Sequence, residues 1–185
     1  MLVDAGEVTS ATTLLAEVRE ALESNCSPLV RSWLIAAHGE TLASNFDRAQ
    51  SLRAFDQSIE LLPADVANDD GPYVALDSTH LARWRGNALA QLADPDAVKV
   101  LVSALERLDS TFTRAETALR TDLMIALNSI NQHEEAIIHG KRALHLALQI
   151  GSVRQEHRLR SQRSDARAMG ANSYRDTTKA QSVND

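Results

Sequence analysis

The stretch "HLARWRGNALAQLADPDAV", residues 80–98, decides the fold of this chain. Apolar residues recur in it every three or four positions as far as Leu92, which is the period of an amphipathic helix. Asp94 and Pro95 follow soon after, and such a pair is typical of a helix start, because aspartate caps a helix and proline fits its first turn. The stretch therefore predicts two helices joined by a short turn.

A helical wheel divides the first of these helices into an apolar and a polar face. Trp84 lies at the edge of the apolar face, so we predict a core position for it rather than a platform that stacks nucleic-acid bases. Arg85 points into the apolar side, where a guanidinium needs a partner. We expect it to pair with Glu116, with Asp122 as the second choice; the alternative is a side chain that extends to water.

Amphipathic segments and breakers alternate along the whole chain. Glycine and proline are sparse, at 7 and 4 of 185 residues, and no useful length of sequence alternates with the period of a strand. The predicted helices cover residues 7–24, 28–44, 47–62, 78–92, 95–108, 111–130 and 132–150, with a weaker one that starts near Ser152. The sequence therefore predicts an all-α fold.

The predicted helices also repeat in pairs. The second helix of a pair carries the spacing small-x3-large-x2-small, as at Ser51, Phe55 and Ser58 and again at Ala97, Leu101 and Ala104. The first helix of a pair carries a glycine, at Gly39 and Gly86, whereas the third pair has Met124 at the glycine position and Gly140 at the large position. Small residues let two helices approach closely, so each pair is predicted to form a tight hairpin.

One run of residues resembles the tetratricopeptide repeat (TPR), whose template is W-x2-L-G-x2-Y, then A-x3-F, then P. The best match is Ile35-x2-His38-Gly39-x2-Leu42, followed by Ser51-x3-Phe55 and by Pro63. Four such units cover residues 1–150, with a period of about 40 residues. The resemblance implies antiparallel helix hairpins that stack into a right-handed superhelix.

A second resemblance concerns the stretch 80–98 together with "LDSTFTRAETALRTDL" (108–123) and "ALQIGSVRQ" (147–155). These segments are similar to the C-terminal helical-repeat half of helix-turn-helix transcriptional regulators of actinobacteria. In that family the DNA-reading half lies upstream, so the resemblance implies DNA contact only through a helix-turn-helix that this chain lacks. The repeat pattern also starts inside a unit, at Gly6. We therefore expect either that a helix upstream is missing or that the first helix is a natural cap. In either case we expect the apolar face of the first helix to be exposed or to form a homodimer.

Charge divides the chain into an acidic body and a basic end. Residues 1–150 hold 12 Lys and Arg against 21 Asp and Glu, and residues 151–185 hold 7 against 4. An acidic body argues against a broad surface for nucleic acid. We predict a TPR-like repeat domain with a truncated first repeat at 1–151, a basic capping helix at 152–168 and a disordered tail at 169–185.

The sequence offers little for catalysis or for metal. The histidines at 133, 139 and 145 are six residues apart, so on one helix they cannot converge on one ion. Cys26 is the only cysteine, and no glycine-rich phosphate loop appears. We therefore expect no enzyme, no cofactor and no metal, with an unrecognised all-helical enzyme as a remote alternative. No apolar run reaches ~18 residues and no secretory signal is present, which favours a cytoplasmic protein that does not enter a membrane.

The resemblance to TPR proteins implies that the first helix of each pair lines a concave groove. The same rotation selects the groove residues Trp33, Glu40, His80, Arg83, Asn87, Gln91, Thr121 and Asn128. Arg83 and Asn87 are similar in type and place to the basic residue and the asparagine of the carboxylate clamp of some TPR adaptors, which implies that a peptide or protein binds there with Arg83 as its anchor. The expected function is the ligand-binding sensor domain of a transcriptional regulator. The alternatives are a free-standing TPR-like scaffold and a polar helix face that only contacts water.

Overall fold

The protein is all-helical in the parts that the computed structural model describes, which are residues 6–22, 25–64, 76–109 and 111–161. The helices are α1 (Val8–Leu22), α2 (Pro28–Ser44), α3 (Arg48–Leu61), α4 (Ser78–Gln91), α5 (Asp96–Arg107), α6 (Thr113–Ser129) and α7 (His133–Gln149), followed by a helix at 153–161. These described residues contain no strand, so the prediction of an all-α fold is confirmed, and α1–α7 begin and end within two residues of the predicted bounds. The rest of the predicted capping helix, 162–168, and the predicted tail, 169–185, lie outside the described residues.

Local sequence signals account for several helix starts. The Ser27 side chain accepts a hydrogen bond from the backbone N–H of Val30, and Pro28 occupies the first turn of α2. Asp77 caps α4 in the same way, through the backbone N–H of His80 at 2.7 Å. Asp94 has a further role, because its buried carboxylate accepts hydrogen bonds from Arg48 at the start of α3 and so connects two hairpins.

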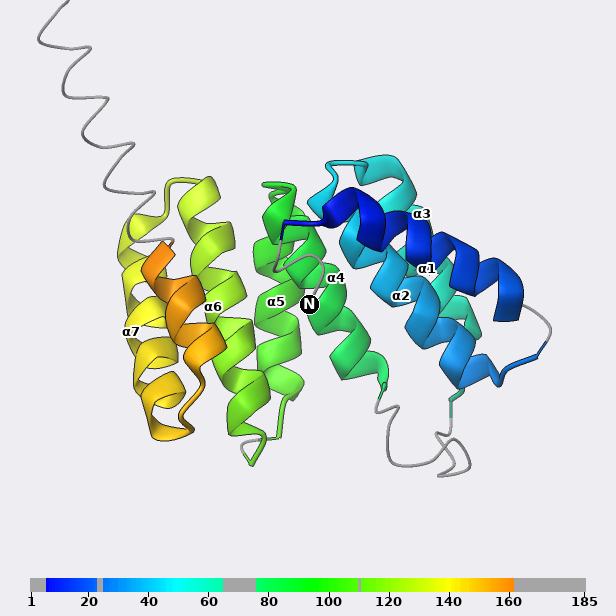
Figure 1. Cartoon of the computed structure of the whole chain (residues 1–185). Coiled ribbons are helices and arrows are strands. Elements are labelled where there is room, and N and C mark those ends of the chain that lie inside the picture. Colours follow the sequence, from blue (N-terminus) through cyan, green and yellow to red (C-terminus); the bar gives the residue numbers. More distant parts are fainter. Residues whose placement is uncertain (1–5, 23–24, 65–75, 110, 162–185) are drawn as a thin grey trace, which may run out of the picture.

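The helices pack as hairpins whose first members lie side by side. Within each pair, α2 contacts α3, α4 contacts α5 and α6 contacts α7, while α2 contacts α4 and α4 contacts α6 (Figure 1). Helix α1 packs against α2, at one end of this row. The row of α2, α4 and α6 therefore presents one continuous face, with α3, α5 and α7 behind it.

Glycines set the close approach within the hairpins. A Cβ atom on Gly86 of α4 would lie 2.5 Å from Cδ2 of the fully buried Leu101 on α5, and one on Gly39 of α2 would lie 3.0 Å from Cε2 of Phe55 on α3. In the third hairpin the two roles have changed helices, since Gly140 of α7 faces the Sδ atom of Met124 on α6 at 2.7 Å from its own Cβ position. The exception in the repeat pattern is thus a compensated exchange of a small and a large residue.

Arg85 does not pair as predicted. Its Nη1 atom lies 2.6 Å from Oδ1 of Asp56 on α3, the second helix of the preceding hairpin. The prediction of Glu116 or Asp122 is wrong, because both of those carboxylates are taken by other arginines. Arg85 is half-buried rather than buried, and its guanidinium extends toward the exposed Asp56 on α3 instead of toward α6.

No helix among the described residues combines the length and the apolar character that crossing a bilayer would require.

Candidate ligand-binding groove

A groove of about 1010 Å³ opens over the row of first helices. Its walls come from α1, α2, α4, α6 and the helix at 153–161. Leu14 and Leu15 of α1 contribute apolar surface, and α2 and α4 contribute Trp33 and Trp84. The two indole rings are tilted by 60° with centroids 6.3 Å apart, and both are only partly exposed, so Trp84 is part of the groove wall as well as of the core behind it.

Five of the eight predicted site residues line this groove, namely Trp33, Glu40, Arg83, Asn87 and Gln91. The other three do not. Thr121 is fully buried and its hydroxyl donates to the carbonyl of Thr117, so it is not a groove residue. The His80 ring packs edge-on against Phe112 away from the groove, and Asn128 contacts His133 through its side-chain oxygen.

The error on α6 is one of rotation. The α6 residues that face the groove are Ala118, Asp122 and Ile125, so the predicted position at Thr121 is one residue out of phase. The helix at 153–161 covers this end of the row and adds Arg154 and Arg158 to the groove wall. The sequence predicts only a capping role for this helix, although the spacing of its two arginines, four residues apart, already places them on one face.

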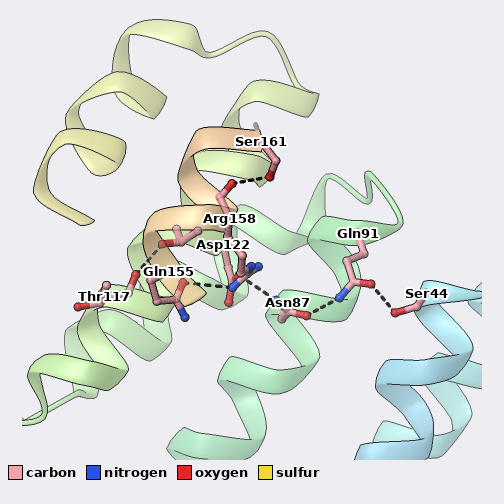
Figure 2. Close-up of polar contacts among 9 residues, drawn as sticks. Ser44, Asn87, Gln91, Thr117, Asp122, Gln155, Arg158 and Ser161 are labelled. Carbon is pink, nitrogen blue, oxygen red and sulfur yellow. Dashed lines mark hydrogen bonds and ion pairs between the residues drawn. The ribbon is translucent and has the colours of Figure 1, made fainter. Parts of the chain in front are cut away.

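A chain of hydrogen bonds crosses the floor of the groove, as Figure 2 shows. Ser44 Oγ donates to Gln91 Oε1 at 2.7 Å, and Gln91 Nε2 donates to Asn87 Oδ1 at 2.5 Å. Asn87 Nδ2 donates to Asp122 Oδ1 at 2.8 Å, and the same oxygen accepts from Arg158 Nη2 at 2.6 Å. The chain thus joins α2, α4, α6 and the helix at 153–161 side by side.

This chain of hydrogen bonds changes the role predicted for Asn87. Both ends of its amide are already oriented by neighbours, Gln91 on one side and the nearly fully buried Asp122 on the other. An amide held in this way joins helices, and it has only its remaining hydrogen and lone pair for a ligand. Asn87 therefore joins helices across the floor, a role that the comparison with a carboxylate clamp does not predict.

The floor chain leaves out three charged groups of the groove, Glu40, Arg83 and Arg154, and of these Arg154 has another interaction of its own. Within the described residues, neither the Glu40 nor the Arg83 side chain forms a hydrogen bond or has an ion-pair partner within 4.0 Å, and Arg83 Nε is buried without a hydrogen-bond partner. Desolvation raises the pKa of the Glu40 carboxyl to about 7, against the lowering effect of the Arg83 charge; Asp122 raises it further and Arg158 and Arg154 lower it. The groove therefore contains one cation and one carboxyl whose hydrogen-bonding capacity is unused.

A second, smaller cavity of about 260 Å³ lies between α1, α2 and α3. Its lining includes Arg19, Cys26 and the buried His38, whose Nδ1 atom lies 2.6 Å from Arg19 Nη1. Burial, and then the Arg19 charge, lower the pKa of His38, so this ring is neutral and accepts the arginine hydrogen bond. His38 is thus a buried histidine whose ring is hydrogen-bonded within the structure. Across the described residues, no group of three His, Cys, Asp or Glu is arranged to hold a metal ion.

Comparison of the chain with models of protein families, with curated proteins and with solved structures gave no match.

Proposed function

We propose that this chain is a non-enzymatic binding domain of TPR-like helix hairpins in a right-handed superhelix, whose groove takes an extended peptide or partner segment. The observation that carries the proposal is Arg83, a guanidinium in a groove of about 1010 Å³ that has no hydrogen-bond acceptor among the described residues. A partly buried guanidinium without an acceptor is costly, and a ligand carboxylate would supply two parallel hydrogen bonds.

The arrangement of the helices supports the TPR-like part of the proposal. First helices that contact first helices, with second helices behind them, are what stacked hairpins produce. The groove lies on the first helices, as the TPR comparison implies, and Trp33 with Trp84 provides apolar surface beside the proposed anchor. Aromatic side chains beside a charged anchor suit a peptide, because they contact its side chains while the guanidinium fixes its register.

The groove chemistry favours binding over catalysis. Its described hydroxyl groups already have acceptors, since Thr41 donates to the carbonyl of His38, Ser161 to the carbonyl of Arg158 and Ser44 to the side chain of Gln91. A nucleophile needs an adjacent base to activate it, and these hydroxyls have no such neighbour within the described lining.

The cellular role that fits best is the sensor domain of a cytoplasmic transcriptional regulator, and this part rests on the resemblance of residues 80–98, 108–123 and 147–155. The second candidate, a free-standing scaffold, is favoured by a different surface. Ile137, Ile138 and Leu148 of α7 are 55%, 65% and 59% exposed, and apolar side chains gathered on one helix suit a protein partner. A helix-turn-helix encoded in frame upstream of Met1 would favour the regulator.

Peptide binding tests the proposal directly. A library of extended peptides with and without Asp or Glu is applied to wild type, to Arg83→Gln and to Arg85→Gln, whose arginine lies two residues away on the same helix and already pairs with Asp56. We expect acidic peptides to bind wild type and Arg85→Gln equally, and to bind Arg83→Gln at least about tenfold more weakly, because the charged pair of hydrogen bonds to the carboxylate is lost. Equal binding to all three proteins, or no binding, would refute the proposal.

A further inference from the structure

Two unlike charges face the same groove without touching each other. Glu40 projects from α2 and Arg83 from the neighbouring α4, and both line the groove. Their nitrogen and oxygen atoms are more than 4.0 Å apart, since no ion pair joins them, and neither has another hydrogen-bond partner in the described residues. Both groups therefore face the same groove with unused hydrogen-bonding capacity, one as a donor and the other as an acceptor.

The other charged groups around Glu40 already have partners of their own. The α1 wall contributes only apolar side chains, Ala11, Leu14 and Leu15. From α6 comes Asp122, which Arg158 and Asn87 already bind, and from the helix at 153–161 come Arg154 and Arg158, of which Arg154 has a further interaction of its own. Arg83 from α4 is the strongest opposite charge that Glu40 experiences, yet it is too distant to bind it.

A purely acidic ligand fits this pair poorly. Its carboxylate would satisfy Arg83 but would stand close to Glu40, and two carboxylates in one partly desolvated site raise each other's proton affinity. A ligand with a carboxylate and an ammonium on the same side would satisfy both groups at once. In an extended peptide, side chains at positions i and i+2 point to the same side and lie about 6–7 Å apart.

We propose, building on the proposed function, that the groove binds a mixed-charge peptide segment whose carboxylate pairs with Arg83 and whose ammonium pairs with Glu40. The simplest such segment is an aspartate and a lysine separated by one residue. The site has two charged subsites on adjacent helices, and the order of the two charges in the peptide sets the direction in which it runs along the groove.

The experiment uses blocked alanine peptides that differ only at those two positions. They carry Asp-Ala-Lys, Asp-Ala-norleucine, Asn-Ala-Lys or Asn-Ala-norleucine, each also in reversed order, and calorimetry measures their binding to wild type, Glu40→Gln and Arg83→Gln. Glu60→Gln and Arg85→Gln are the matched controls, because both side chains lie outside the groove lining. Circular dichroism establishes that each variant is folded.

We expect wild type to bind the peptide with Asp and Lys about tenfold more tightly than the peptide with Asp and norleucine. Glu40→Gln should remove that difference, Arg83→Gln should remove the preference for Asp over Asn, and the two controls should keep both. Equal binding of the two Asp peptides to wild type would overturn the ammonium subsite and leave the Arg83 anchor intact. No preference for Asp over Asn would instead overturn the proposed function itself.

The direction of the pH dependence gives a second readout. An ammonium stabilises ionised Glu40, so binding of the mixed peptide should release a proton and tighten from about pH 6 to about pH 8. The peptide with Asp and norleucine should weaken over the same range, because its carboxylate favours protonated Glu40. A mixed peptide that weakens as the pH rises would contradict the proposal.

Discussion

At the scale of the residue, Glu40 shows how a binding position weakens the fold that carries it. The pKa of its carboxyl rises from 4.5 to about 7 through desolvation. Between these two values the folded protein holds a proton that the unfolded chain releases, so the stability that Glu40 contributes falls as the pH rises and stays low above about pH 7. Function at this position would thus come at the expense of stability.

Glu40→Gln is therefore predicted to stabilise the protein at high pH. The variant should exceed wild type by about 1–3 kcal/mol near pH 8, because the amide has no charge to desolvate, and the two should be equal near pH 4. Urea denaturation at both pH values measures this, with Glu60→Gln on the exposed face of α3 as the control. A variant less stable than wild type at pH 8 would mean that ionised Glu40 is well solvated in the groove.

Two arginines on the same protein give a second test at this scale. Arg85 pairs with Asp56, whose side chain is 59% exposed, whereas Arg158 pairs with Asp122, whose side chain is 3% exposed. Arg85→Met should cost less than about 1 kcal/mol, since exposed ion pairs contribute little. Arg158→Met should cost about 2–4 kcal/mol, because it leaves a buried carboxylate with Asn87 as its remaining partner. Equal costs in denaturant titrations would contradict the distinction.

At the scale of the element, the hairpins depend on a small residue opposite a large one. Gly86→Ala brings a Cβ atom to 2.5 Å from Cδ2 and 2.7 Å from Cγ of the fully buried Leu101, which has little room to move. It should therefore cost about 1–3 kcal/mol. Gly140→Ala meets the flexible end of Met124, so its cost should stay below about 1 kcal/mol. Thermal unfolding of both variants compares them, and Gly86→Ala should cost less in a Leu101→Ala background than in wild type if the clash is the cause of its loss.

The helices of the hairpins are also the part of the fold that the sequence predicts best. Periodicity, caps and breakers placed α1–α7 within two residues, since those signals act between near neighbours in the chain. The lining of the groove is harder to predict from the sequence, because whether Thr121 or Asp122 faces the groove depends on a rotation of α6 by one residue. The partners of Arg85 and Asn87 come from other helices, and only the packed structure shows which carboxylate lies nearest.

At the scale of the whole molecule, the hairpins are held in a row by unequal contacts. The floor chain from Ser44 to Arg158 joins α2, α4 and α6 to the helix at 153–161, and buried residues are numerous on α2 and α6. Helix α1 buries only Ala11 among its described residues and leaves Leu14 49% exposed. In a linear array each unit is stabilised by its neighbours, so stability should decrease toward the end that has the fewest contacts.

Native-state hydrogen exchange should reveal that gradient. Amides of α1 should exchange first, at a small opening free energy, whereas amides of α4 and α6 should exchange near the global free energy of unfolding. Arg158→Met should lower protection in the helix at 153–161 and in α6 before it affects α1, since the broken contact lies at the opposite end of the row. A peptide bound between Glu40 and Arg83 should raise protection in α2 and α4. Uniform protection in all helices, changed equally by Arg158→Met, would show one cooperative unit rather than an array, and would argue against the TPR-like arrangement proposed for this chain.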